Sequence, residues 1–300
     1  MTPIAQLNFD QLIGKEVGTS TLLNELARGG MAVIFVAYQR TLKRQIAVKV
    51  LPKSLLTTLA AELFQQEAEA AAILSHPNIV TIYEVGEAED FLFITMQLVK
   101  GRSLLDYIKK ARKHVLPSKR MLPLKATLKI ITDVLDALDY AHHEDIIHRD
   151  IKPANVLIET HTKRPIISDF GLATTTRVPE RDSSKIAGTP TYMAPEQILN
   201  NPVDRRTDVF ATGVMLFEML VSRLPLPSFK TATELLRMRL ELKDRLFQKK
   251  PSEMNPVLNR EMDEIVFKAL SHDPENRYAT CREFLKAIEV YRDNHMKKLH

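Results

Sequence analysis

Residues 148–155 read HRDIKPAN, and the interpretation of the whole chain starts from this stretch. A chain of 300 residues matches His-Arg-Asp with an Asn five positions after the Asp by chance about once in 500 cases. Asp150 can orient and deprotonate a hydroxyl group, Asn155 can give an oxygen to a metal ion, and Lys152 can neutralise a transferring phosphate. Each residue alone has a structural alternative, since an Asp in a loop is most often a turn or cap residue.

A second polar motif, Asp169-Phe170-Gly171, follows an apolar run at residues 166–167. An Asp in this place can hold Mg²⁺, a hard cation that takes few carboxylates together with phosphate oxygens. Gly171 permits a sharp change of backbone direction. The tripeptide alone is a weak signal, and its position 19 residues after Asp150 makes it a strong one.

Upstream, the segment Gln45–Leu51 alternates as a strand, with Ile46, Val48 and Val50 on one side and Lys49 on the other. Lys49 shares its side with the small Ala47, which indicates a wall with room for an anionic ligand.

Residues Thr58–Leu74 have the period of a helix. Glu67 interrupts the apolar stripe of this helix, and a carboxylate in a core-facing position needs a cation partner because its burial alone is costly. The stripe consists of Ala60, Leu63, Glu67, Ala71 and Leu74.

The composition is that of a globular protein, with 45% hydrophobic and 26% charged residues. The one cysteine, Cys281, excludes an internal disulfide and an all-cysteine metal site and favours a reducing compartment. The net charge of +5 fits an ordinary solvated surface, so no nucleic-acid partner is expected. The basic stretch Lys109–Arg120 is predicted to be a surface loop. The first residues lack the pattern of a signal peptide, and no run of about 18 apolar residues is present, so no membrane span is expected.

The order of the remaining patterns predicts two lobes, the first rich in strands with one helix and the second mostly helical. A cleft between two such lobes is a common ligand site. The predicted division is an extension at 1–20, a small lobe with its hinge at 21–99 and a large lobe at 100–300. The predicted strands are two within 21–50 around a turn at 28–30, followed by strands at 79–85, 91–99, 146–148, 156–158 and 166–167. The predicted helices include one whose apolar stripe runs from 124 to 142, and further helices at 207–221 and 262–270.

These motifs resemble the eukaryotic-like, or Hanks-type, protein kinase family, specifically its bacterial Ser/Thr members, from about Thr19 to Tyr291. The resemblance implies the α+β, two-lobed protein kinase fold and transfer of the ATP γ-phosphoryl group to Ser or Thr hydroxyls of proteins. It implies that Lys49 positions the phosphates and is held by Glu67. It also implies Asn155 and Asp169 as ligands of Mg²⁺, with Mn²⁺ as an alternative. The implied catalytic set is Asp150, Lys152, Lys49, Glu67 and Asn155.

The resemblance also places a nucleotide site, although the glycine-rich loop departs from the family pattern. Of the three glycines in G-x-G-x-x-G only the middle one, Gly29, is kept, because Ala27 and Ala32 take the places of the others. Met96 falls at the gatekeeper position, and the hinge at 97–99 would bind adenine. The implied nucleotide contacts are Ala27, Arg28, Gly29, Gly30, Met31, Ala32, Ile34, Ala47, Lys49, Met96, Gln97, Val99, Leu157 and Asp169.

Further residues support the catalytic machinery by the same resemblance. Ala194-Pro195-Glu196 matches the family's anchor, in which Glu196 should pair with Arg277, and Asp208 should brace the catalytic loop. His148 should pack under the metal-binding triplet without proton chemistry. Lys152 and the segment at 188–193 are typical of Ser/Thr kinases, with Thr189 expected to contact Asp150 and Lys152.

The segment between Asp169 and Glu196 carries a cluster of hydroxyl residues, and Arg149 precedes the catalytic Asp. This combination predicts regulation by autophosphorylation within Leu172–Tyr192, with a homodimer as the arrangement for reaction in trans. The chain is expected in the cytoplasm, alone or as the cytosolic part of a longer membrane-anchored protein. The alternative function is a pseudokinase, a nucleotide-binding or scaffolding module without turnover, because two glycines are replaced. The hydroxyl residues are Thr174, Thr175, Thr176, Ser183, Ser184 and Thr189.

Overall fold

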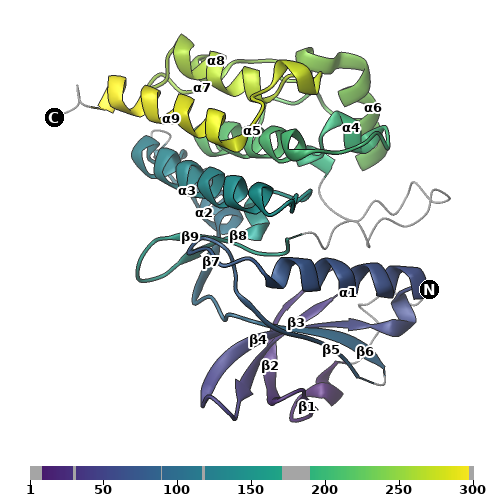
Figure 1. Ribbon diagram of the computed structural model, residues 1–300. Coiled ribbons are helices and arrows are strands. Elements are labelled where there is room, and N and C mark those ends of the chain that lie inside the picture. Colours follow the sequence, from purple (N-terminus) through teal and green to yellow (C-terminus); the bar gives the residue numbers. More distant parts are fainter. Residues whose placement is uncertain (1–8, 30–31, 89, 117–118, 171–189, 297–300) are drawn as a thin grey trace.

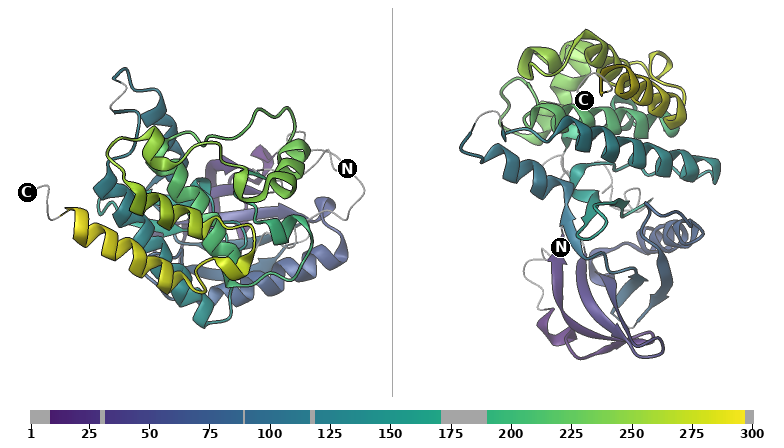
Figure 2. Two further views of the ribbon diagram at one scale, coloured as in Figure 1. Left: turned by 90° about the horizontal axis from the view of Figure 1, so that it is seen from above. Right: turned by 90° about the vertical axis from the view of Figure 1, so that its left-hand side faces the viewer.

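The computed structural model describes residues 9–29, 32–88, 90–116, 119–170 and 190–296. It has two lobes, a β-sheet with one long helix and a group of packed helices, with a small three-stranded sheet between them (Figure 1). The same separation is visible in the right-hand view of Figure 2. The predicted two-lobed α+β fold is therefore confirmed.

The small lobe is built on a six-stranded antiparallel sheet in the order β1-β2-β3-β4-β6-β5. On β4 the alternation predicted from the sequence is confirmed, because Ile46, Val48 and Val50 pack in one core cluster while Lys49 faces the other side. The strands are β1 (Glu16–Val17), β2 (Ser20–Arg28), β3 (Val33–Gln39), β4 (Arg44–Pro52), β5 (Ile82–Glu87) and β6 (Phe91–Met96).

Helix α1 (Thr58–Ala72) follows the predicted helical segment closely. Its described buried side chains are Phe64, Ala68 and Ala71, which lie four and three residues apart and so share one face. Leu74 just beyond the helix is buried as predicted. The side chains of the other stripe residues, Ala60, Leu63 and Glu67, lie outside the described part of the structure.

The large lobe is organised around α5 (Arg205–Val221), whose residues from Thr207 to Val221 are all buried. A helix buried on all sides forms the centre of a domain, and two polar residues of α5, Asp208 and Glu218, are paired. The predicted stripe of α3 is confirmed, since Leu128, Ile131, Leu135 and Leu138 are fully buried. The other elements are α2 (Leu104–Arg112), α3 (Leu124–His143), α4 (Pro195–Ile198), α6 (Ala232–Leu242), α7 (Pro251–Met254), α8 (Arg260–Ala269), α9 (Cys281–Met296), β7 (Gly101–Ser103), β8 (Val156–Glu159) and β9 (Pro165–Ile167).

Two sequence predictions are wrong in detail. Ile146–His148 is not a strand, so the loop with Asp150 comes directly after α3 and leads into β8. The stretch Lys109–Arg120 is not a simple surface loop, because Lys109–Arg112 forms the last turn of α2.

The division of the chain at residues 20 and 99 stays a prediction. Residues before Ser20 nevertheless contribute to the small lobe, since Phe9 and Val17 are buried in the core cluster of Leu22. In the described part of the chain, none of the helices combines the length and apolar character that a membrane span requires.

Candidate active site

Asp150, Lys152 and Asn155 form one cluster in the loop between α3 and β8. Lys152 Nζ lies 2.6 Å from Asp150 Oδ2, and the Asn155 amide nitrogen donates to Asp150 O at 2.9 Å and to Oδ2 at 3.1 Å. Both partners of this amide are acceptors, so its nitrogen faces Asp150 and its oxygen faces away. The Asp150 side chain is 37% exposed, so its carboxylate remains open to a substrate.

Asp208 on α5 fixes the backbone of this loop. Its carboxylate accepts the N–H of His148 at 2.9 Å and of Arg149 at 2.8 Å, and it lies 2.8 Å from His142 Nε2. Arg149 has a φ of 66°, a left-handed conformation that L-residues rarely adopt, and the bond to Asp208 helps to hold it there. Asp208 was predicted to brace the catalytic loop, and the geometry confirms this.

His148 connects the loop to the Asp169 triplet. Its Nδ1 accepts the N–H of Asp150 at 3.2 Å, so Nε2 carries the proton and donates to Ser168 O at 2.9 Å. The ring packs edge-on against Phe170, with centroids 4.6 Å apart. Both ring nitrogens are occupied, which agrees with the predicted packing role.

Lys49 and Asp169 join the two lobes across the site. Lys49 Nζ lies 2.5 Å from Asp169 Oδ1, and Asp169 has a φ of 64°. Burial acts to raise the pKa of the Asp169 carboxyl, but the charge and hydrogen bond of Lys49 outweigh it and hold that pKa below its ordinary value. The predicted pair of Lys49 with Glu67 is not tested, because the Glu67 side chain lies outside the described residues.

An apolar wall lies beside this pair and contains several predicted nucleotide contacts. Ala47 and Met96 are direct cross-strand neighbours on β4 and β6, and Ile34 and Val99 pack against them. Leu157 on β8 is half-buried and is paired with Ile166 of the same cluster.

The next residue after Met96 has one backbone group engaged. The N–H of Gln97 donates to Thr81 O at 2.9 Å, so this N–H is used within the protein.

The glycine-containing turn joins β2 to β3, and Gly30 and Met31 lie outside the described residues. Gly29 N–H donates to Ala32 O at 2.9 Å, which closes the hairpin. Ala27 pairs with Ile34 in the ladder of these strands and has no left-handed φ. Alanine at the first glycine position therefore fits the backbone without strain. Ala32 is buried in one cluster with Leu51 and Phe64.

Arg28 at the end of β2 is directed toward its own strand. It bonds to both carboxylate oxygens of Glu25, at 3.1 and 2.6 Å, and lies over the Phe9 ring.

The predicted anchor pair is confirmed by geometry. Arg277 binds Glu196 through two parallel contacts of 2.8 Å each, and its side chain is completely buried. Thr207 Oγ1 also donates to Glu196 at 2.8 Å. Burial acts to raise the pKa of Glu196, and Arg277 outweighs it and lowers the pKa below its ordinary value.

Sequence reasoning missed residues that connect the anchor region to the loop. The Gln197 side chain accepts the N–H of Ala194 at 3.0 Å and donates to Arg149 O at 2.9 Å. Glu218 on α5 accepts the Tyr192 hydroxyl and pairs with Arg112 of α2. Glu218 is the lone carboxylate in the apolar run 211–221, and this was a sequence signal for its contacts with Tyr192 and Arg112. The sequence around Gln197 contains no comparable signal.

Predictions for the segment at 171–189, including the six hydroxyl residues and the contact of Thr189, lie outside the described residues. Within the described part of the chain there is no group of three or more His, Cys, Asp or Glu residues that could hold a metal ion.

Comparison with known proteins identifies the family. Residues 20–288 match the protein kinase domain family. A probable serine/threonine-protein kinase of Streptomyces coelicolor is 36% identical over 279 residues, 89% of this chain and 39% of that protein. The serine/threonine-protein kinase PrkC of Bacillus subtilis is 33% identical over 284 residues, 93% of this chain and 41% of that protein. The crystal structure of the Mycobacterium tuberculosis PknI kinase domain aligns with a TM-score of 0.72 and 27% identity, covering 93% of this chain and 98% of that one.

The chain belongs to the protein kinase domain family, among the bacterial Hanks-type Ser/Thr members. This family uses ATP and a divalent metal ion and acts on proteins. The chain spans about 40% of the length of these curated relatives.

Proposed function

We propose that the chain transfers the γ-phosphoryl group of ATP to Ser or Thr hydroxyls of proteins. The observation that carries this proposal is the partly exposed Asp150 carboxylate, with Lys152 and Asn155 in direct contact and the Lys49–Asp169 pair across the lobes. Catalysis of phosphoryl transfer is mostly positioning and electrostatics. It therefore needs a proton acceptor, cations and oxygen ligands for a metal ion, and this cluster contains all three.

In this proposal Asp150 orients the substrate hydroxyl and receives its proton as the hydroxyl oxygen bonds to the γ-phosphorus. The bond between that phosphorus and the β–γ bridging oxygen breaks in the same transfer, and ADP leaves. Lys152, 2.6 Å from Asp150, is close enough to offset negative charge on the transferred group. Lys49 would bind the non-transferred phosphates, with Glu67 on α1 as its proposed partner, and Asp169 would be a ligand of the metal.

Asn155 and Asp169 suit Mg²⁺, since the oxygen side of Asn155 faces away from Asp150 and Asp169 is an ionised carboxylate. The bound metal would neutralise charge on the phosphate oxygens. Mn²⁺, which takes similar oxygen ligands, is the alternative. Asn155 also fixes the direction of the Asp150 side chain by its hydrogen bond.

Adenine would lie against Ala47, Met96, Val99 and Leu157, and the turn containing Gly29 would cover the phosphates. The remaining proposed contacts with the nucleotide are Arg28, Gly30, Met31, Ala32, Ile34 and Gln97.

A Ser/Thr substrate is favoured over Tyr by Lys152 and by the segment at 188–193, which are typical of Ser/Thr kinases. We further propose autophosphorylation within 172–192 between two copies of the chain, because Arg149 stands beside Asp150 and can pair with a phosphate. A cytosolic location belongs to the same proposal, because ATP is supplied there.

The test is incubation of the purified chain with Mg²⁺ and γ-labelled ATP, followed by mass mapping of the phosphate. We expect label on Ser or Thr, including sites within 172–192. A Mg²⁺-dependent thermal shift with ATP and no label on any added protein would support the pseudokinase instead. If the protein shows no label and no thermal shift with Mg²⁺-ATP, the proposal is contradicted.

A further inference from the structure

Arg239 on α6 is a buried cation with an unusual environment. Its side chain is among the largest fully buried ones, with 1% exposure, and it lies over the ring of Phe210, 5.1 Å from the centroid. Arg277 lies over the same ring at 4.8 Å, but Arg277 has Glu196 as its partner. Burial, followed by the charge of Arg277, lowers the pKa of Arg239 to about 10, so Arg239 stays charged at neutral pH.

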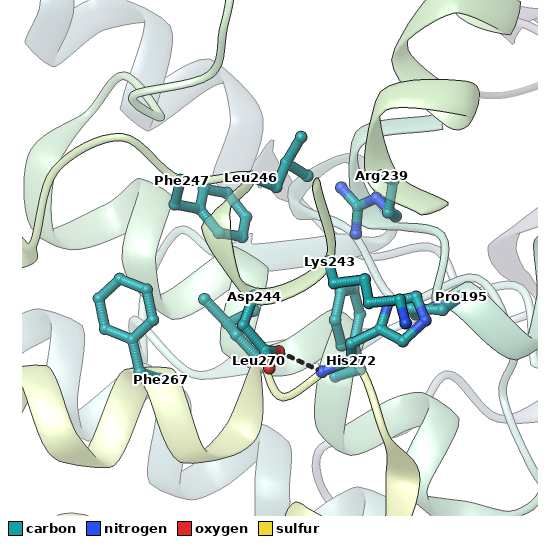
Figure 3. A pocket seen from close by; sticks show the side chains of 10 residues that line it. Pro195, Arg239, Lys243, Asp244, Leu246, Phe247, Phe267, Leu270 and His272 are labelled. Atoms are coloured by element: carbon teal, nitrogen blue, oxygen red, sulfur yellow. Dashed lines mark hydrogen bonds between the residues drawn. The ribbon is translucent and has the colours of Figure 1, made fainter. Parts of the chain in front are cut away.

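The charge of Arg239 is directed at backbone carbonyls, since in the described part of the chain no carboxylate pairs with it. Arg239 Nη1 donates to Met193 O at 3.0 Å and Nη2 donates to Thr191 O at 2.6 Å. Figure 3 shows Arg239 at the edge of a small pocket that Asp244 also lines. Asp244 is engaged elsewhere, because its Oδ1 accepts the N–H of His272 at 2.6 Å.

The carbonyls that Arg239 binds belong to a segment held next to Asp150. On the other side of this segment, Gln197 accepts the N–H of Ala194 and donates to the carbonyl of Arg149, the residue before Asp150. Residues 190–194 are therefore clamped between α6 and the loop of Asp150. Thr191 and Met193 are half-buried, so part of each reaches the surface, and Gln197 ties this segment to Arg149, the residue before Asp150.

We infer that Arg239 is a positioning residue for the protein substrate: it fixes the backbone of Thr191 and Met193, against which the polypeptide flanking the acceptor hydroxyl packs. This inference rests on the proposed kinase function and adds to it the residue that shapes the substrate surface. Burying a cation that no carboxylate of the described residues pairs with is costly, so stability alone would favour an apolar side chain at this position. Two charge-assisted hydrogen bonds to one short segment explain why arginine is useful here.

The test compares Arg239→Met with Arg237→Met, which makes the same substitution at an exposed position of the same helix. In Arg239→Met we expect the KM for a Ser/Thr peptide to rise about tenfold, which corresponds to about 1.4 kcal/mol. The KM for ATP should stay within about twofold, because Arg239 contacts no part of the nucleotide wall. Arg239→Lys, which keeps the charge and can reach one carbonyl, should give an intermediate peptide KM. Arg237→Met should match the wild type in both constants.

A second measurement separates this inference from the kinase function. Hydrogen exchange of the amides at 191–193 should be faster in Arg239→Met than in Arg237→Met and intermediate in Arg239→Lys. If the wild type proves inactive, the proposed function fails and the exchange rates still decide whether Arg239 holds the segment. An unchanged peptide KM with unchanged exchange would overturn the inference, and so would an equal rise of the KM values for peptide and ATP.

Discussion

Asp150 depends on residues that do not touch the substrate. Arg149 beside it adopts a left-handed conformation with a φ of 66°, and Asp208 accepts the N–H groups of His148 and Arg149. Such a conformation persists only when surrounding contacts hold it. The carboxylate direction is then completed by Asn155, which donates to Asp150 Oδ2. In its proposed role as the base, Asp150 would need little rearrangement when a hydroxyl arrives.

We expect Asp150→Asn to lower the phosphotransfer rate by roughly 10²–10⁴, because an amide cannot take the proton of the hydroxyl. ATP binding should be kept, since Asp150 does not belong to the nucleotide wall. Initial rates with a Ser/Thr peptide and calorimetric titration with Mg²⁺-ATP measure the two effects.

The control for this prediction is Asp145→Asn, an exposed residue just after α3 with a φ of 58°. Asparagine tolerates this left-handed conformation, so the control should behave as the wild type. A normal rate in Asp150→Asn would reject the role assigned to Asp150.

The chemical types in the site could be predicted from the sequence, but not all of their partners. Alternation on β4 was enough to place Lys49 on a wall facing an anion. Which carboxylate it meets, Glu67 or Asp169, depends on how the two lobes lie, and no local pattern contains that information. Arg239 was missed for a similar reason, since its acceptors are backbone carbonyls of a distant segment.

Among the elements, periodicity succeeded where one face is buried. The stripe of α3 and the alternation of β4 were predicted correctly, whereas the run Ile146–His148 is too short for periodicity to distinguish. Its N–H groups show why it is not a strand: that of Ile146 donates to Ala141 O at 2.9 Å and that of His148 donates to Asp208. Neither of these N–H groups is therefore available for hydrogen bonds to a neighbouring strand.

Helix α2 was missed although its start is encoded locally. Ser103 and Asp106 form a capping box, in which each side chain bonds the backbone N–H of the other. The basic residues of the last turn were interpreted as a loop, but cations there favour a helix because they face its negative end.

The turn between β2 and β3 leads to a prediction for Ala27. Ala27 pairs with Ile34 just after a register shift between Glu25 and Ala27, and its φ is not left-handed, so its Cβ causes no strain that a glycine would relieve. We expect Ala27→Gly to change the ATP dissociation constant by less than about twofold and to lower the unfolding free energy by about 0.5–1 kcal/mol. Calorimetric titration and urea unfolding measure these values. An affinity gain of tenfold would show that this alanine does impair nucleotide binding.

The contact between α4 and the segment around Arg277 leads to a second prediction at the level of secondary-structure elements. Glu196→Gln leaves Arg277 buried without its counter-charge, so we expect a loss of about 3–5 kcal/mol in unfolding free energy by urea denaturation. Glu264→Gln, which breaks the exposed pair with Arg260, should cost no more than about 1 kcal/mol. Equal losses in the two variants would contradict this importance of the buried pair.

For the whole molecule, the two lobes are connected by more than the hinge. Residues before β5 pair with β9, since Val80 N–H donates to Ile167 O at 2.9 Å and Ile167 N–H donates to Asn78 O at 2.8 Å. Asp169 follows Ile167 by two residues, so a segment of the small lobe helps to position a proposed metal ligand of the large lobe. The sequence predicted two lobes with a cleft, but this pairing joins residues far apart in the chain and left no periodic signal.

Among the described residues, two buried carboxyls have lowered pKa values, and a buried thiol and a buried phenol have raised ones. In Asp208 burial acts to raise the pKa, but the hydrogen bond with His142 and the backbone N–H of His148 outweigh it, and the pKa falls below its ordinary 3.8. Glu196 is likewise lowered from 4.5 by Arg277. In Cys281 burial, reinforced by nearby carboxylates, raises the pKa well above 9.0, and in Tyr192 burial and then Glu218 raise it above 10.0.

These directions predict a melting temperature that falls on both sides of a plateau. A carboxyl with a lowered pKa contributes stability that is present above its ordinary value of 3.8–4.5 and is lost as the pH falls through its folded pKa. A group with a raised pKa contributes stability that is present below its ordinary 9.0 or 10.0 and is lost as the pH rises toward its folded pKa. Thermal unfolding from pH 3.5 to 11 at constant ionic strength measures the profile. Cys281→Ala should move the start of the alkaline decline upward, and Glu196→Gln should flatten the acid decline. A melting temperature that stays constant to pH 3.5, or an alkaline decline unchanged in Cys281→Ala, would show that these buried groups do not cause the acid and alkaline declines.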